Sequence, residues 1–324
     1  MKVIIPLAGF GTRLRPHTWS RPKPLVNVAG KPVLGHILDM FEEMGIQDVV
    51  FIIGWLGDQI QEYVQSNYDF EAHYVVQKEL KGQAHAIYLA REHLEGPCLI
   101  AFVDTLFEAD LSGLSVDADG VLFVQEVDDP RRFGVIVEEG DRVVQLIEKP
   151  EGFEHRKAMI GVYYVQEGAR LVDAIEHLLT HDMQTKGEYY LADAFQIMID
   201  RGARIISRPV SVWEDCGKPE TVLQTNRYLL EHGHTQEIET KNSVLVPPVH
   251  VARSAKVENA VVGPYVTVGE DVCITNAILC NVIVEDGSRI DNVILENSLI
   301  ARRASIVGPI HQLNVGDDNR IDLS

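Results

Sequence analysis

The order of apolar and polar residues predicts alternating strands and helices in the first third of the chain. Apolar runs typical of buried strands occur at 3–7, 48–53 and 98–103. Apolar residues at helical spacing follow Pro32, which suits the start of a helix, and Gly45 ends that pattern. Strands that alternate with helices predict an α/β fold, with a Rossmann-like doubly wound sheet whose strands are mostly parallel.

A different pattern begins near residue 120, where short apolar strands follow one another directly. The sequence E-E-G-D at 138–141 separates two of them and is typical of a hairpin turn. Helical spacing returns at 168–180, 189–201 and 218–231. We therefore expect the α/β domain to extend through this region.

The last part of the chain contains a repeat of 16 residues. Val268, Val284 and Ile300 share this step, and a second aliphatic series with the same step begins at Ile274, six residues after the first. Aliphatic residues at hexapeptide spacing predict a short β-solenoid whose coils stack their side chains inward.

These patterns divide the chain into three parts. We predict an α/β domain at 1–231 and a β-solenoid at 248–324. The stretch 232–247 is polar at its start and is predicted to be a linker.

Composition and charge narrow the class of protein. The 324 residues include 46% hydrophobic and 24% charged residues, which is ordinary for a globular protein. A net charge of −19 argues against nucleic acid or an anionic membrane as a partner. No apolar run approaches the ~20 residues of a membrane span, and the four cysteines form no C-x-x-C pair. We expect a cytoplasmic protein with free thiols.

The first predicted strand leads into a loop of unusual charge. The loop contains Gly9 and Gly11, and no acidic residue precedes Asp39. The formal charge through residue 38 is +6, contributed by Lys2, Arg13, Arg15, Arg21, Lys23 and Lys31. Glycines let backbone N–H groups approach phosphate oxygens, and basic side chains neutralise phosphate charge. The loop is therefore predicted to bind a polyanion.

Two other interpretations of this loop account for fewer of its residues. A dinucleotide-binding fingerprint requires G-x-G-x-x-G at the start of a helix, but Leu14 occupies the third glycine position. Pro16, Pro22 and Pro24 also oppose an immediate long helix. The other interpretation is a solvated basic loop without a ligand. Prolines between the cations favour a fixed shape, which a merely solvated loop does not need.

These motifs resemble the signature of sugar-1-phosphate nucleotidyltransferases. The resemblance rests on A-G-F-G-T-R-L-R-P at 8–16, P-K-P-L at 22–25 and G-K-P at 30–32. The most similar members carry a C-terminal left-handed β-helix and include glucose-1-phosphate thymidylyltransferases and mannose-1-phosphate guanylyltransferases. The resemblance implies a GT-A-like catalytic domain, followed by a left-handed β-helix through which the chain forms a homo-oligomer.

The resemblance also implies a reaction, in which a nucleoside triphosphate and a hexose 1-phosphate give a nucleotide sugar and pyrophosphate. Arg13, Lys23, Asp104 and Asp215 would be catalytic, and the two aspartates would bind Mg²⁺. Fixed cations and a hard divalent cation suit the charge that develops during phosphoryl-type transfer. The nucleotide-binding residues implied by the resemblance are Leu7, Ala8, Gly9, Gly11, Thr12, Arg13, Gln77 and Gly82.

Residues of the sugar side are implied in the same way. They are Gly134, Glu148, Lys149, Gly161 and Glu188. Within the motif E-K-P at 148–150, the lysine would contact the sugar phosphate and the glutamate the sugar hydroxyls. The chain departs from the family at Tyr190, which replaces an acidic residue found in some members. The identity of the sugar therefore stays open.

The identity of the nucleotide stays open as well. Gln77 and Gly82 lie five residues apart, as in members that read a pyrimidine base. Pro24 stands where strict thymidylyltransferases commonly have glutamine, and K-P-L is common among guanylyltransferases. Glucose 1-phosphate with dTTP or UTP is the leading combination, and mannose-1-phosphate guanylyltransferase is the alternative.

Two alternatives concern the class of protein. The first is a non-catalytic regulatory or scaffold protein that binds nucleotide sugars, although the charged residues of the site are all present. The second is an acyltransferase site in the solenoid. Such sites need a catalytic histidine, and in this region only His250 and His311 are near.

Overall fold

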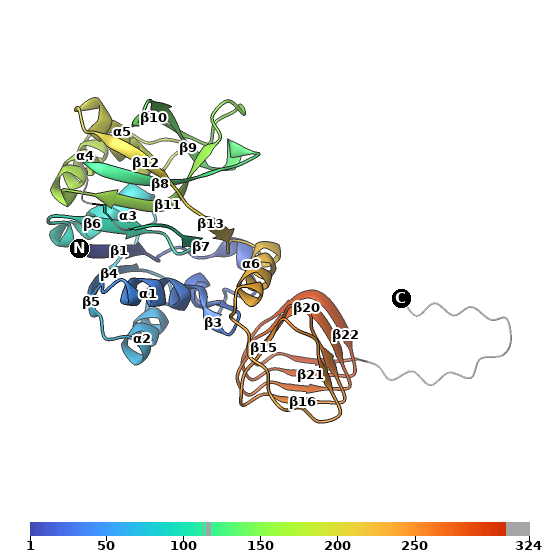
Figure 1. The fold of residues 1–324 in the computed structure, drawn as a ribbon. Coiled ribbons are helices and arrows are strands. Elements are labelled where there is room, and N and C mark those ends of the chain that lie inside the picture. Colours follow the sequence, from blue (N-terminus) through green and yellow to red (C-terminus); the bar gives the residue numbers. More distant parts are fainter. Residues whose placement is uncertain (112, 115–117, 309–324) are drawn as a thin grey trace. The chain divides into compact units, whose positions relative to one another are not determined.

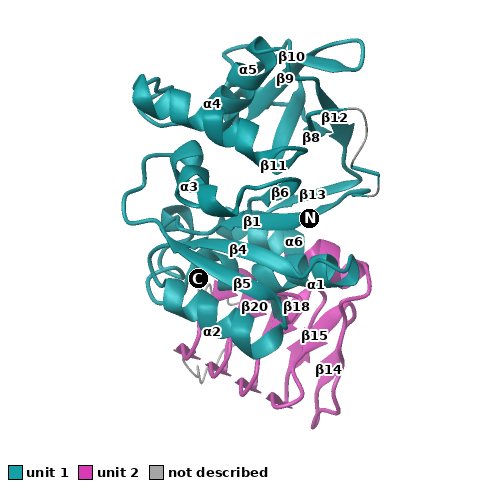
Figure 2. Ribbon diagram, turned by 90° about the vertical axis from the view of Figure 1, so that its left-hand side faces the viewer, with its two compact units in different colours: residues 1–26, 31–225 teal, residues 27–30, 226–324 magenta. Residues whose placement is uncertain are grey.

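The computed structural model describes residues 1–111, 113–114 and 118–308 (Figure 1). The chain forms two compact units, which Figure 2 shows in different colours. As far as the structure describes them, the first contains residues 1–26 and 31–225, and the second contains residues 27–30 and 226–308. The end of the predicted solenoid, 309–324, lies outside the described residues. Helix α6 (Pro219–Glu231) contributes to both units, so the contacts divide the chain shortly before the boundary predicted at 231.

A nine-stranded mixed sheet forms the centre of the first unit, counted over the described residues. Its main path runs in the order β10-β9-β11-β6-β1-β4-β5, with β8 paired to β11 and β12 to β8. The strands are β1 (Lys2–Pro6), β4 (Asp48–Ile53), β5 (Glu71–Val76), β6 (Cys98–Ala101), β8 (Gly120–Glu126), β9 (Gly134–Glu139), β10 (Arg142–Glu148), β11 (Lys157–Val165) and β12 (Ile205–Pro209).

The half of the sheet that precedes residue 102 is parallel, as the alternation of strands and helices predicts. Strand β1 pairs in parallel with β4 and β6, and β4 pairs in parallel with β5. Pro6 is the last residue of β1, where the lack of an N–H group disturbs the ladder least. The other half is mixed, since β11 pairs antiparallel with β6, β8 and β9.

Helices cover this sheet. Helices α3, α4 and α5 share one apolar core with Ile4, Val50 and Ile100 of the parallel strands, while α1 and α2 lie near β4 and β5, apart from α4 and α5 (Figure 1). None of the described helices is long and apolar enough to cross a membrane. The helices of the first unit are α1 (Val33–Glu43), α2 (Gly57–Asn67), α3 (Gln83–Leu89), α4 (Gly168–Thr180) and α5 (Leu191–Asp200), with short 3-10 turns η1 (Thr12–Leu14), η2 (Lys23–Leu25), η3 (Arg91–His93) and η4 (Pro130–Arg132).

A short antiparallel ribbon stands apart from the main sheet. It consists of β7 (Thr105–Glu108) and β13 (Val212–Asp215), and Thr105 pairs with Asp215. The ribbon therefore brings two segments that are about 110 residues apart in sequence to adjacent positions.

The second unit is the predicted hexapeptide β-helix. Val268 pairs with Val284, and Val284 with Ile300, which confirms the 16-residue step. The strands are β14 (Val244–Leu245), β15 (Val249–Val251), β16 (Lys256–Glu258), β17 (Val261–Val262), β18 (Val266–Val268), β19 (Cys273–Thr275), β20 (Ile278–Val284), β21 (Arg289–Asp291), β22 (Ile294–Ile300) and β23 (Ser305–Val307). Their inward valine, isoleucine and leucine side chains form a continuous core.

Much of the stretch 232–247, which the sequence predicted as a linker, joins this β-helix. Strand β14 pairs with β17, and Gln236 and Lys241 form parallel bridges to the following coil. Polar side chains suited a linker, but backbone pairing depends little on side-chain polarity when one face is solvated.

A short segment from the beginning of the chain also belongs to the second unit. It includes β2 (Asn27–Val28) and precedes β3 (Lys31–Pro32). The backbone N–H of Ala29 donates to Oδ1 of the buried Asn226 (2.8 Å), and that oxygen also accepts from the Thr267 hydroxyl (2.6 Å). The N–H of Asn27 donates to Oε1 of Glu285 (3.1 Å).

Candidate active site

A hollow of about 390 Å³ opens in the first unit where strands β1, β5 and β6 end. Ligands of parallel α/β sheets bind in the crevice outside the carboxyl ends of the strands, which is where this hollow lies. Its lining includes many of the residues implied by the family resemblance: Leu7, Ala8, Gly9, Gly11, Thr12, Arg13, Lys23, Gln77, Gly82, Asp104 and Glu188.

The glycine loop has the backbone that a phosphate cradle needs. Gly11 has a φ of 60°, and a side chain there would meet Cβ of Lys23 at 2.9 Å, so only glycine fits. The Thr18 hydroxyl donates to the Gly11 carbonyl (2.8 Å) and holds this turn. At Gly9 a Cβ atom would meet nothing within 4 Å, which leaves the backbone open to a ligand.

Two cations and two carboxylates converge beside this loop. Nζ of Lys23 lies 3.7 Å from Oδ2 of Asp104. The Arg13 guanidinium lies beside Gly217, whose N–H donates to Oδ1 of Asp215 (2.7 Å). A backbone hydrogen bond holds together the segments that carry the two aspartates. The N–H of Cys216, the residue after Asp215, donates to the Asp104 carbonyl (2.9 Å). Arg13, Lys23 and Asp104 therefore line the hollow, and Asp215 accepts a hydrogen bond from the lining residue Gly217 without being part of the lining itself.

The donor set at this point fits a hard divalent cation. Asp104 and Asp215 supply carboxylate oxygens from adjacent chain segments, and the Asp104 side chain is 49% exposed. Within the described parts of the chain, no cluster of three or more His, Cys, Asp and Glu side chains is placed to hold a metal. Two protein carboxylates with phosphate oxygens and water are a usual arrangement for Mg²⁺.

The loop after β5 forms another wall of the hollow. Gln77 is buried, and its Nε2 donates to the Glu79 carbonyl (3.2 Å) and lies 3.4 Å from Nδ1 of His85. Gly82 has a φ of 111°, and a Cβ atom there would lie 2.5 Å from the Tyr189 carbonyl oxygen. This close approach places the segment that carries Glu188 at the rim.

The residues predicted to bind the sugar phosphate form a second cluster in the same unit. Gly134 and Glu148 are register partners on β9 and β10, and a side chain at Gly134 would meet Oε2 of Glu148 at 2.8 Å. Burial raises the pKa of the Glu148 carboxyl, although the neighbouring Lys149 ammonium opposes that rise. Burial also raises the pKa of Tyr163, and the charges of Glu148 and Asp104 contribute in the same direction.

The cluster lies beyond the 390 Å³ hollow rather than in its lining. Glu188 is the member that lines the hollow, whereas Gly134, Glu148, Lys149 and Gly161 do not. Phe102 connects the hollow to this cluster. It lines the hollow, and its N–H donates to the carbonyl of Gly161 in the cluster (2.9 Å).

Sequence reasoning missed several residues of the lining. Gly217 lies two residues after the predicted metal ligand Asp215, and a glycine so close to a ligand was the signal by which the sequence could have identified it. The others are mostly apolar and carry no recognisable pattern. The additional lining residues are Pro6, Leu80, Gln83, Ala86, Phe102, Val103 and Gly217. Pro24, which the sequence analysis connected with the choice of nucleotide, lines the hollow as well.

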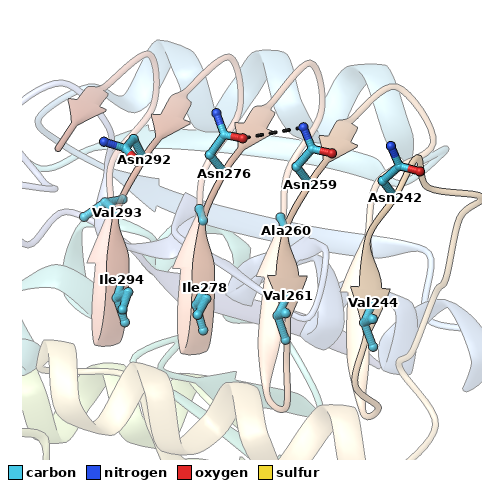
Figure 3. Close-up of a pocket in the computed structure, with 11 residues that line it drawn as sticks. Asn242, Val244, Asn259, Ala260, Val261, Asn276, Ile278, Asn292, Val293 and Ile294 are labelled. Carbon is cyan, nitrogen blue, oxygen red and sulfur yellow. Dashed lines mark hydrogen bonds between the residues drawn. The ribbon is translucent and has the colours of Figure 1, made fainter. Parts of the chain in front are cut away.

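A second hollow, of about 770 Å³, lies on the β-helix (Figure 3). Each coil contributes one asparagine and one outward aliphatic residue: Asn242 and Val244, Asn259 and Val261, Asn276 and Ile278, Asn292 and Ile294. The four asparagines have φ between 49° and 55°, a conformation that asparagine tolerates better than most residues. No charged residue is among those that line this hollow in the described coils. The repeat thus reflects turn geometry, and the described lining consists of asparagine amides and aliphatic side chains.

Models of known families match both units. The nucleotidyl transferase family model matches residues 2–232, and the GlmU-like C-terminal hexapeptide model matches residues 233–292.

Curated proteins of several kinds are similar to this chain. A glucose-1-phosphate thymidylyltransferase of Streptomyces griseus is 29% identical over the full length of both chains. The low-salt glycan biosynthesis nucleotidyltransferase Agl11 of Haloferax volcanii is 35% identical over 71% of this chain and 66% of its own. The bifunctional protein GlmU of Methanococcus vannielii is 30% identical over 72% of this chain, which spans only 56% of that protein.

A solved structure shares the fold. It is a putative glucose-1-phosphate thymidylyltransferase from Bacillus anthracis in complex with a sucrose, with a TM-score of 0.61 and 23% identity. The match covers 74% of this chain and 98% of that one.

Proposed function

Because the chain belongs to the nucleotidyl transferase family, we propose that it transfers a nucleotidyl group from a nucleoside triphosphate to a hexose 1-phosphate. The observation that carries the proposal is the convergence of Arg13, Lys23, Asp104 and Asp215 beside an open glycine loop. A loop with this charge and backbone suits a triphosphate, and a second polar cluster nearby suits a sugar phosphate.

The chemistry needs no nucleophile from the protein. An oxygen of the sugar phosphate attacks the α-phosphorus in line, and the bond from that phosphorus to the bridging oxygen of pyrophosphate breaks. Negative charge develops on the α-phosphate oxygens and on the leaving pyrophosphate. Arg13 and Lys23 would stabilise that charge, which is the main contribution a protein makes to such transfers.

Asp104 and Asp215 are the residues that would hold Mg²⁺. When bound, the ion would supply positive charge at the triphosphate and help to orient it. Lys23 lies within ion-pair distance of Asp104 and so limits the repulsion between carboxylate and phosphate oxygens.

For the substrates we propose glucose 1-phosphate with dTTP or UTP. Two curated relatives that cover the full chain, from Streptomyces griseus and Streptomyces antibioticus, carry the name glucose-1-phosphate thymidylyltransferase. Mannose 1-phosphate with GTP is the second candidate, because Pro24 lines the hollow where a glutamine would favour the strict thymidine type.

The test is a pyrophosphate-release assay of the purified full-length protein. It combines the four common nucleoside triphosphates and dTTP with glucose 1-phosphate, mannose 1-phosphate and N-acetylglucosamine 1-phosphate, with and without Mg²⁺. We expect Mg²⁺-dependent turnover for one pair. Binding of a nucleotide sugar without any turnover would instead support the regulatory alternative and overturn the proposal.

We also propose that copies of the chain associate through the β-helix, in the cytoplasm. The hexapeptide region supports association, since such repeats stack extended surfaces. The uncharged hollow on the β-helix supports it as well, because a chain with a net charge of −19 can approach a second copy most easily at an uncharged surface. The four free cysteines suit a reducing compartment.

A further inference from the structure

The side chain of Lys149 has two competing partners. Its Nζ donates to the hydroxyl oxygen of Tyr190 (3.1 Å) and lies 3.7 Å from Oε1 of Glu148. The ammonium also lies 5.3 Å from the centre of the Tyr190 ring. The closer contact is thus with the neutral hydroxyl, and the carboxylate is the more distant partner.

Tyr190 is the rigid member of this pair. Its side chain is buried, and the residue forms the N-cap of α5, where Asp193 accepts from its backbone N–H. The preceding residue is also fixed, since Tyr189 accepts from the N–H of Ala84 and donates to the Lys81 carbonyl. Lys149, by contrast, has a long side chain that is 42% exposed. The buried tyrosine therefore offers a fixed partner to the more exposed lysine side chain.

The geometry points to Tyr190 as a positioning residue for the sugar phosphate, an inference that rests on the proposed function. We propose that its hydroxyl holds the Lys149 ammonium away from Glu148 and toward the phosphate of the hexose 1-phosphate. A hydroxyl can do this without neutralising the ammonium, whereas a carboxylate at position 190 would pair with it. Lys149 keeps its charge for the phosphate, and Glu148, whose ion pair with Lys149 is the longer of the two contacts, can still accept from sugar hydroxyls.

The charges around Lys149 agree with this role. The hydrogen bond to Tyr190 raises the pKa of Lys149, and the carboxylates of Glu148 and Glu188 contribute in the same direction. A raised lysine pKa keeps the ammonium charged at higher pH. Loss of the Tyr190 hydroxyl should therefore lower this pKa and make phosphate binding fail at a lower pH.

The first experiment compares Tyr190→Phe with the wild type in steady-state kinetics. We expect KM for the sugar phosphate to rise by about two- to tenfold, the worth of one hydrogen bond. KM for the nucleotide should stay unchanged, and the rise of sugar-phosphate KM with pH should begin at lower pH. Tyr189→Phe is the matched control, because that hydroxyl contacts Asp182 and Gln184 rather than Lys149.

Two further variants test the mechanism. Tyr190→Glu should raise KM for the sugar phosphate more than Tyr190→Phe does, because it neutralises the ammonium. In a Lys149→Ala background, Tyr190→Phe should have no further effect, since the two residues act as a unit. Additive effects would overturn the positioning role.

A measurement without substrate separates this inference from the proposed function. NMR titration of dimethylated Lys149 should show a lower pKa in Tyr190→Phe than in the wild type. A wild type that turns over no substrate pair would refute the proposed function, whatever the titration shows. An active wild type whose sugar-phosphate KM and Lys149 pKa are both insensitive to Tyr190→Phe would refute the inference alone.

Discussion

The hollow on the β-helix is larger than the hollow in the first unit, but no charged residue is in its described lining. The larger, about 770 Å³ on the β-helix, has only amide and aliphatic side chains in its described lining. The smaller, about 390 Å³, has Arg13, Lys23, Asp104 and Glu188 in its lining. The volume of a hollow is therefore a poor indicator of a candidate active site, and charged side chains of opposite sign in its lining are a better one.

The hollows also arise in different ways. The β-helix hollow repeats one unit from coil to coil, so its chemistry is fixed by a turn that asparagine tolerates. The other hollow combines segments near residues 9, 23, 77, 104 and 217, which the parallel sheet and the β7–β13 ribbon bring together. Repetition gives a uniform surface, whereas convergence of distant segments gives a site in which each side chain has a separate role.

The largest effect is expected from removing a carboxylate at the charged hollow. Asp104→Asn should lower Mg²⁺-dependent pyrophosphate release by about 10³-fold or more, because one of two metal ligands is lost. Circular dichroism should show an unchanged fold. Asp69→Asn, at an exposed position of the same unit, is the control and should keep full activity. Retained turnover in Asp104→Asn would refute the metal assignment.

Removing a cation should have the next largest effect. Arg13→Ala should lower kcat by about 10²-fold, since a fixed charge at the developing negative charge is lost. Arg15→Ala is a matched control from the same loop, because the Arg15 guanidinium lies over the Trp19 ring (4.0 Å) and is not part of the lining. A change confined to KM would show that Arg13 contributes uniform binding instead.

A smaller effect is expected from a backbone change in the wall of the charged hollow. Gly82→Ala should raise KM for the nucleotide and lower the free energy of unfolding by about 1–3 kcal/mol, because its φ of 111° and its approach to Tyr189 both exclude a Cβ atom. Thermal denaturation and steady-state kinetics measure the two effects. Gly152→Ala, where nothing lies within 4 Å, should leave both quantities unchanged, and a neutral Gly82→Ala would show that the loop relaxes freely.

The smallest effect on catalysis is expected at the uncharged hollow. Ile294 is 67% exposed, and Ile294→Asp should keep kcat within about twofold, because the residue lies on the β-helix unit. Light scattering should show a lower mass, since the charge opposes contact between copies. Val307→Asp, equally exposed but outside the hollow, should keep the wild-type mass. A mass unaffected by Ile294→Asp would refute contact through this surface.

The sequence predicted most of the fold because its patterns are local. The helix α1 and the strand β4 lie where apolar spacing placed them, and the 16-residue step of the β-helix matches the observed strand register. The strand order in the mixed half of the sheet was harder to predict from the sequence, because it depends on pairing between distant segments such as β8 and β12. The coil formed by 236–247 was missed because its backbone pairs without an apolar pattern.

The candidate site was predictable where chemistry leaves a residue type in a motif. Arg13, Lys23 and Asp104 carry charge, and they were found from the sequence and family resemblance. Phe102 and Leu80 are apolar residues among many others, and only the fold shows that they line the hollow. The contact of Lys149 with Tyr190 spans 41 residues, so no motif contains both.

The segment 27–30 has a consequence for how this protein can be divided. Its backbone N–H groups donate to Asn226 and Glu285. The second unit therefore includes four residues from the beginning of the chain, shortly after Lys23. A protein truncated after residue 231 would lose Glu285 and leave the Asn27 N–H without that acceptor. Exchanging β-helices between relatives therefore requires transplanting two separate stretches of sequence, and a single cut near residue 231 would produce a mismatched hybrid.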